Sequence, residues 1–176
     1  MGHFIIGIDS EYTQDRNDSD QNIALSYQWF CIHDGVEWGG IHYAIDGERI
    51  SLIDWIRMAI TSRPGRRTRW PDEVCIVFHH GVAELSIIND WDDWKRSLNL
   101  VQKSFASVGA LPKTITDRSR NQHHVRVRLY DTVMLVGGPT PLSAIGETLG
   151  ISKISLPDGA IERMDKLLAD DPELFE

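Results

Sequence analysis

Cysteine is scarce in this sequence, and its scarcity removes two classes of protein. Only two cysteines, Cys31 and Cys75, occur among the 176 residues, and each lies inside an apolar run. They do not form a pair with the spacing of a zinc site, and two thiols cannot build the disulfide framework of a small secreted domain. We therefore expect two buried, reduced thiols in a cytoplasmic protein.

Long apolar runs and an N-terminal targeting segment are also missing. No run approaches the roughly 20 apolar residues that a membrane-spanning helix needs. The N-terminus lacks a basic stretch followed by a long apolar one, and Ile6 stands where a myristoylation signal requires Ser or Thr. The sequence therefore predicts no signal peptide and no membrane partner.

An excess of positive charge is lacking as well. The net charge is −8, and residues 158–176 contribute −5 of it, with seven acids against Arg163 and Lys166, which leaves −3 for residues 1–157. Bulk charge therefore gives no sign of a nucleic-acid partner, although local basic patches can serve that purpose. A hydrophobic content of 41% and a charged content of 25% are ordinary, and the length suits one domain with its own core.

What the sequence does contain is a succession of strand-like and helix-like segments. Apolar and β-branched runs predict strands at residues 4–9, 23–33, 36–45 and 73–80, with "DG" at 34–35 as a hairpin turn. Residues 13–22 are expected to form a loop. The strand at 73–80 is expected to be parallel and buried.

Helical spacing follows at several places. Helices are expected at 51–60 with Ser51 as N-cap, at 83–98 with a centre that can break, at 140–150 with Thr140 as cap, and after residue 159. Residues 101–109 fit a strand or a helix, and residues 123–135 begin with strict alternation and end as an apolar strand. This order predicts an α/β fold with a mixed sheet flanked by helices.

Two carboxylates end the first expected strand. Asp9 and Glu11 are two residues apart in "GIDSEYT", so a strand projects both to one face. Like charges this close repel each other, and each carboxyl keeps its proton unless a cation intervenes. Mg²⁺ and Mn²⁺ prefer carboxylate oxygens, and two ions about 4 Å apart can serve phosphoryl transfer. The alternative is that the strand ends here and both acids are solvated.

A second polar group follows the strand at 73–80, in "VFHHGVAELSII". His79, His80 and Glu84 come at or near its C-terminal end, where ligand sites form in α/β sheets. His80 and Glu84 share a helical face if a helix has already begun. Alternatively, the histidines are loop residues and Glu84 is an acid favoured at a helix N-terminus. Farther along, Asp131 interrupts an apolar run, and we expect it or Thr132 to bond nearby backbone.

Together, "GIDSEYT", "VFHHGVAELSII" and "LYDTVMLVGGPTPLSAIGETLGISKISLP" resemble the motifs of DEDD-type 3′–5′ exonucleases. The resemblance is greatest to the proofreading exonuclease domain of family B DNA polymerases of phages, plasmids and organelles. It implies an RNase H-like fold, with Asp9 and Glu11 as the first motif. His80 and Glu84 fall on the second motif, where the family has Asp in place of Glu84.

The resemblance also implies a mechanism. Asp9, Glu11 and Glu84 would hold one or two Mg²⁺ or Mn²⁺ ions, with His80 or His79 as a further site residue. The reaction would be hydrolysis of terminal phosphodiesters in DNA or RNA. The implied partners are the 3′ end of a single strand and a polymerase domain or another protein.

The last motif of the family has no counterpart in this chain. That motif is Tyr-x-x-x-Asp, or a variant with His, on a helix after the "K-LP" segment. No Tyr follows Tyr130, and Asp165, Asp170 and Asp171 do not fit the pattern. We therefore expect one exonuclease-like domain over residues 1–176 without the C-terminal helix that carries the fourth carboxylate.

This departure keeps other functions open. One is a catalytically incomplete RNase H-like module that binds nucleic acid or a partner protein, and another is an unrelated metal-dependent phosphohydrolase. For strand binding, arginines that bind phosphates and aromatic rings that stack on bases are the expected groups. They occur in two clusters, Arg66, Arg67, Arg69 and Trp70 in the first, and Lys113, Arg118, Arg120, Arg126 and Arg128 in the second. Either cluster could instead be a solvated surface.

Overall fold

A computed structural model of the chain describes residues 4–14, 22–65, 70–101, 104–107, 109–135, 140–151, 156–160 and 163–175. Its strands are β1 (Phe4–Gln14), β2 (Asn22–His33), β3 (Val36–Tyr43), β4 (Glu73–Phe78), β5 (Leu98–Val101), β6 (Ser104–Ser107), β7 (Leu111–Thr116) and β8 (Gln122–Asp131). The α-helices are α1 (Leu52–Thr61), α2 (Gly81–Glu84), α3 (Trp91–Lys95), α4 (Thr132–Leu135), α5 (Leu142–Thr148), α6 (Met164–Asp170) and α7 (Pro172–Phe175). Two short 3₁₀ helices are η1 (Ile45–Gly47) and η2 (Leu85–Ile87).

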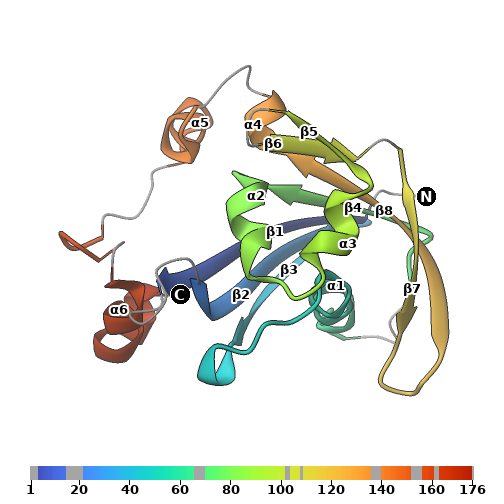
Figure 1. The fold of residues 1–176 in the computed structure, drawn as a ribbon, viewed down its shortest axis with the longest axis horizontal. Coiled ribbons are helices and arrows are strands. Elements are labelled where there is room, and N and C mark those ends of the chain that lie inside the picture. The colour runs from blue at the N-terminus through green and yellow to red at the C-terminus, as the bar shows by residue number, and fades with distance from the viewer. Residues whose placement is uncertain are drawn as a thin grey trace.

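The described strands form one mixed sheet. Its order is β3-β2-β1-β4-β8-β6-β5, and β7 pairs with β8 beside this path (Figure 1). β1 pairs with β2 in antiparallel and with β4 in parallel orientation, and β4 pairs with β8 in parallel. The predictions of a mixed sheet and of a parallel strand at 73–80 are therefore confirmed, and the C-terminal ends of β1, β4 and β8 lie at the same edge.

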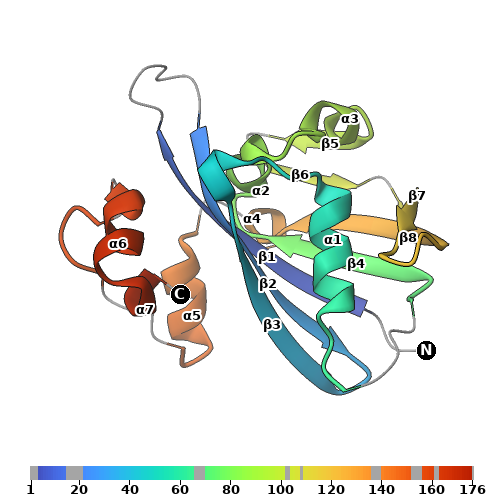
Figure 2. The ribbon, with the colours of Figure 1, turned by 90° about the horizontal axis from the view of Figure 1, so that it is seen from below.

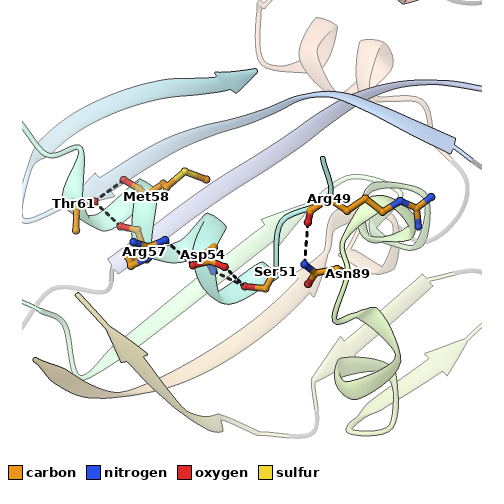
Figure 3. Close-up of polar contacts among 7 residues, drawn as sticks. All are labelled: Arg49, Ser51, Asp54, Arg57, Met58, Thr61 and Asn89. Carbon is orange, nitrogen blue, oxygen red and sulfur yellow. Dashed lines mark hydrogen bonds and ion pairs between the residues drawn. The ribbon is translucent and has the colours of Figure 1, made fainter. Parts of the chain in front are cut away.

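Local sequence explains the first hairpin and helix. Asp34 and Gly35 both have positive φ, 49° and 72°, the backbone of a tight two-residue hairpin turn. Ser51 is the N-cap of α1, because its hydroxyl accepts a hydrogen bond of 2.9 Å from the Asp54 backbone N–H (Figure 3). Asp54 also pairs with Arg57 across the first turn at 2.6 Å. The predicted hairpin turn at residues 34–35 and the predicted N-cap at Ser51 are therefore confirmed.

The core lies between one face of the sheet and α1. Alternate residues of β1 (Phe4, Ile6 and Ile8) are buried on this face together with Trp55 and Ile56 of α1. Buried tryptophans reach polar partners there, as Trp38 Nε1 donates to the Ala59 carbonyl at 2.9 Å. The helices α5, α6 and α7 lie on the opposite side of the sheet from α1 (Figure 2). A smaller buried cluster of Ala160, Met164 and Leu167 packs there on Leu25 and Ile41.

Several predicted boundaries differ from the structure. The expected helix at 83–98 is divided into α2, η2 and α3, with the break at the Asn-Asp segment. Residues 101–109, which fit either a strand or a helix, contain strand. β1 extends five residues beyond its predicted end, into the loop expected at 13–22. The N-cap of α5 is Pro141 rather than Thr140. The apolar run after Asp131 is the helix α4 rather than strand. In the described chain, no helix is long and apolar enough to cross a membrane.

β7 was not predicted, and it forms an arm with β8. Residues 122–127 of β8 pair with β7, whereas residues 126–131 pair with β4. The two ladders overlap only at Arg126 and Val127. The β7–β8 arm, residues 111–127, therefore extends past the central strands as a two-stranded ribbon (Figure 1).

Candidate functional site

The parallel pairing of β1 and β4 brings the first two sequence motifs together. Gly7 of β1 pairs with Val77 of β4, so both strands end at the same edge of the sheet. Asp9 and Glu11 lie just beyond this pair on β1, and β4 leads into α2, which carries Glu84. The hydroxyl of Ser10 donates a hydrogen bond of 2.5 Å to Glu84 Oε2, which joins the two motifs directly.

The alternation of β1 decides which side chains face the site. Ile8 and Ser10 are buried, Asp9 is exposed, and Glu11 is half-buried. Asp9 and Glu11 therefore share the face away from α1, as their spacing predicts. A bulge between Glu11 and Tyr12 ends this regular alternation.

Glu84 carries the clearest electrostatic signature of the site. Burial and, after it, the negative charges of Asp9 and Glu11 raise the pKa of its carboxyl to about 8, against the lowering effect of the hydrogen bonds with Ser10. The pKa of the Tyr12 phenol is raised too, first by burial and then by the charges of Glu84 and Glu11. The site thus concentrates negative charge that a proton or a cation stabilises.

The site fits a divalent cation in its donor chemistry but less well in the spacing of its side chains. The donor chemistry fits, because carboxylate oxygens are the ligands that Mg²⁺ and Mn²⁺ prefer. The spacing fits less well: among the residues that the structure describes, no group of three or more His, Cys, Asp or Glu side chains is arranged to hold a metal ion. The carboxylate of Glu84 is instead hydrogen-bonded to Ser10.

Asp131 fixes the turn that follows β4. Its carboxylate is buried, 1% exposed, and accepts hydrogen bonds from the backbone N–H groups of His80 at 3.2 Å and Gly81 at 3.0 Å. It also accepts from the Val133 N–H at 3.0 Å. The prediction that Asp131 bonds nearby backbone is confirmed. One residue thus clamps the β4–α2 turn to the junction of β8 and α4.

The two histidines of this turn have different environments. His79 Nδ1 lies 2.7 Å from the Thr132 hydroxyl, and its Nε2 is buried without a hydrogen-bond partner among the described residues. Burial, followed by the neighbouring His80, lowers the pKa of His79. His80 is exposed and has a left-handed backbone, φ 60° and ψ 45°, which histidine adopts more readily than most residues. The predicted role of His80 stays a prediction.

A cavity of about 530 Å³ opens beside Asp9 and His79. Its walls are mostly apolar, and they come from β1 to β4, from the first residue of α4 and from the first turn of α5. Phe30, Ile41 and Leu142 are among the lining residues. Phe30 is 50% exposed, so one side of its ring faces open space. The volume and the few polar groups at one end are typical of a site for a small organic group.

The predicted strand-binding residues are only partly described. Arg66, Arg67 and Arg69 lie outside the described residues. Trp70 is described, and its ring stacks on that of His123 with centroids 4.2 Å apart and an angle of 11° between the planes. One face of Trp70 is therefore already occupied, which leaves at most the other for a base.

Sequence reasoning missed Ser10, Tyr12 and Thr132 as parts of this site. The position of Ser10 between Asp9 and Glu11 could have indicated its role. In a strand, the residue between two residues that share the open face points to the buried face. Nothing local indicated Tyr12 or Thr132, because their neighbours at the site come from other elements.

Comparison with known proteins adds one similarity. Over 97% of its length the chain is similar to part of the primer-independent DNA polymerase PolB of Escherichia coli, with 27% identity over 195 aligned positions. The chain spans 22% of the length of that polymerase. No protein-family model and no solved structure matches the chain. The chain is thus similar to a segment of a DNA polymerase.

Proposed function

We propose that this chain is a metal-dependent 3′–5′ exonuclease domain with an RNase H-like fold, associated with a DNA polymerase. The observation that carries the proposal is that Asp9 and Glu11 of β1 lie at the same edge of a mixed sheet as Glu84 of α2, which Ser10 of β1 contacts directly. Burial of Glu84 raises its pKa most, and the charges of Asp9 and Glu11 add to that effect. The similarity to part of a DNA polymerase supports a substrate that is nucleic acid.

In this proposal Asp9, Glu11 and Glu84 would hold one or two Mg²⁺ or Mn²⁺ ions, and such ions would lower the pKa of a water and stabilise the charge on the leaving oxygen. The water oxygen would bond to the terminal phosphorus and lose a proton, the P–O3′ bond would break, and the 3′ oxygen of the shortened strand would take up a proton. The product is a nucleoside 5′-monophosphate.

The chain's own residues position the substrate. The terminal nucleoside would occupy the cavity beside Asp9, where the exposed side of Phe30 offers a surface for the base. His79 lines the same cavity, and its unpaired Nε2 would hydrogen-bond a substrate oxygen while Thr132 holds the other ring nitrogen. The Asp131 clamp would keep the histidine turn in place.

The test is degradation of a 3′-labelled single-stranded oligonucleotide with Mn²⁺ or Mg²⁺. We expect stepwise shortening from the 3′ end that stops with EDTA and falls at least 100-fold, a typical loss for a group that stabilises transition-state charge, in the Asp9→Asn, Glu11→Gln double variant. A matched control is Glu37→Gln with Glu147→Gln, which removes the same charge from exposed positions. If the Asp9→Asn, Glu11→Gln variant keeps its activity, the assignment of the active site to these residues is wrong.

A second function is favoured by one observation, the absence of a three-residue metal group among the described residues. In that case the chain is a non-catalytic module that binds nucleic acid or a partner protein. It would bind the same oligonucleotide with no shortening at any Mn²⁺ concentration, and its affinity would not change in the Asp9→Asn, Glu11→Gln variant.

A further inference from the structure

Positive charge is concentrated in short segments of this acidic chain, and the segment at residues 111–128 is described throughout. Residues 111–128 form the β7–β8 arm and its base, and they carry five cationic side chains against one acid, Asp117, a balance of +4. The rest of the chain therefore carries −12, because the total is −8. Such segregation creates a local positive potential that the net charge hides.

The arm has one packed face and one open face. Ile115 and Val125 are buried on the packed face and belong to the main core. The other face is exposed at Thr114, His124 and Arg126, and a shallow hollow of about 170 Å³ lies among them. The open face is thus available to a partner, while the packed face keeps the arm attached to the protein.

The turn of the arm is rigid and presents two arginines. Asp117 accepts hydrogen bonds from the backbone and side-chain N–H groups of Asn121, at 2.9 and 3.1 Å, and its Oδ2 lies 3.0 Å from His123 Nε2. The Asp117 carboxylate therefore contacts Asn121 and His123 of the arm itself. Arg118 and Arg120 are exposed, and within the described part of the chain neither makes an ion pair.

Two more arginines continue this positive surface along β8. Arg126 and Arg128 point to one side of the strand and share the carboxylate of Glu73, at 3.4 and 2.8 Å. One carboxylate cannot neutralise two guanidinium groups, so the pair keeps a positive charge. Their spacing of two residues is about 7 Å along a strand, which suits neighbouring phosphates of an extended nucleic-acid strand.

The arm lies far from the carboxylates. β8 begins at Gln122 beside the turn and ends at Asp131, the clamp of the candidate site. Nine residue steps of about 3.3 Å separate these two ends by about 30 Å, and Figure 1 shows the arm at the opposite end of β8 from α4.

We propose that the open face of the β7–β8 arm binds the phosphate backbone of a single nucleic-acid strand, several nucleotides from the end that enters the carboxylate site. Arg118, Arg120 and Arg126 contact the phosphates, and β8 sets the distance between arm and site. The inference rests on the proposed function for the direction of the strand, but binding to the arm requires no cleavage.

The test compares the affinities of a 20-nucleotide and a tetranucleotide single strand by fluorescence anisotropy in EDTA. At about 7 Å per phosphate, the spacing that Arg126 and Arg128 would match, the three steps of a tetranucleotide span about 21 Å, too short to reach from the site to Arg118 and Arg120 at the turn of the arm. The informative variant is Arg118→Ser with Arg120→Asn, because Asn tolerates the positive φ of 66° at residue 120. Lys166→Glu on α6 changes the net charge by the same two units elsewhere on the surface.

We expect the arm variant to bind the 20-mer about 10-fold more weakly at 0.1 M salt, with the slope of log affinity against log salt reduced by about 1.4, or 0.7 per lost phosphate contact. The advantage of the 20-mer over the tetranucleotide should largely disappear. Lys166→Glu should change the affinity less than twofold. Unchanged binding by the arm variant, or an equal loss in Lys166→Glu, overturns the inference.

Two further outcomes separate this inference from the proposed function. If binding depends on the arm but Mn²⁺ causes no shortening of the strand, the inference about the arm stands and the proposed exonuclease function fails. If the strand is shortened but binding does not depend on the arm, the exonuclease function stands and the inference about the arm fails. A 10-fold loss that is the same for duplex and single strand overturns the assignment of a single strand.

Discussion

Replacing Glu84 by Gln should stabilise the protein in a manner that depends on pH. The unfolded carboxyl titrates near 4.5, whereas burial and the charges of Asp9 and Glu11 raise the folded pKa to about 8. Between these values the folded chain keeps a proton that the unfolded chain has released, so the free energy of unfolding falls as pH rises through this window. Glutamine does not titrate, and its amide oxygen still accepts the Ser10 hydroxyl.

The expected magnitude follows from that interval. About 3.5 pH units, at about 1.36 kcal/mol for each unit, set an upper limit on the order of 5 kcal/mol for the stability that Glu84→Gln gains above pH 8. Below pH 4.5 both side chains are neutral, and the gain should vanish. Urea denaturation in EDTA at pH 4, 7 and 9 measures it, with Glu147→Gln as the exposed control.

One result would refute this reasoning. A difference between Glu84→Gln and the parent protein that is the same at pH 4 and pH 9 would show that the folded protein does not raise the pKa of Glu84, and hence that Glu84 is not buried beside Asp9 and Glu11. Added Mn²⁺ gives a further comparison, because a cation held by the three acids should stabilise the parent protein and narrow the difference at pH 9.

Three other substitutions test the framework around the site. Asp131→Ala removes the acceptor of three backbone N–H groups, one in a buried and two in partly buried hydrogen bonds, and should cost about 3 kcal/mol of unfolding free energy in urea. Asp131→Asn should cost less, and equal costs would contradict the clamp. Gly40→Ala places a methyl group 2.4 Å from a Trp29 ring carbon and should cost about 1–3 kcal/mol, seen as a lower Tm; an unchanged Tm would contradict this packing. Ser51→Ala removes the N-cap of α1 and should cost about 1 kcal/mol by the same measurement; no loss would mean that the cap contributes nothing.

Features written in neighbouring residues were predictable. The turn at Asp34 and Gly35, the cap at Ser51 and the parallel strand at 73–80 each depend on short patterns that local physics decides. The bond from Asp131 to the Val133 N–H was predictable for the same reason, whereas its bonds to His80 and Gly81 depend on the pairing of β4 with β8.

Features decided by distant contacts were not predictable. β7 has only Leu111 and Ile115 as apolar residues, and its strand depends on pairing with β8 and on burial of Ile115. Glu84 could be suggested as a ligand from its spacing, but its bond to Ser10 and its raised pKa depend on how β1 and α2 meet. Trp70 was expected either to stack on a base or to be part of a solvated surface, and only the fold places His123 against it.

The small overlap between the two ladders of β8 divides that strand into regions of different local stability. Residues 126–131 lie inside the central sheet, where opening requires disruption of β4 as well, while residues 122–125 pair only with β7. Two-stranded ribbons are marginal by themselves, so the amides of the outer half should exchange with solvent sooner than those of the inner half. The outer half of β8 should therefore exchange before the Asp131 clamp opens, while the burial of Ile115 and Val125 in the core limits how far the arm can separate.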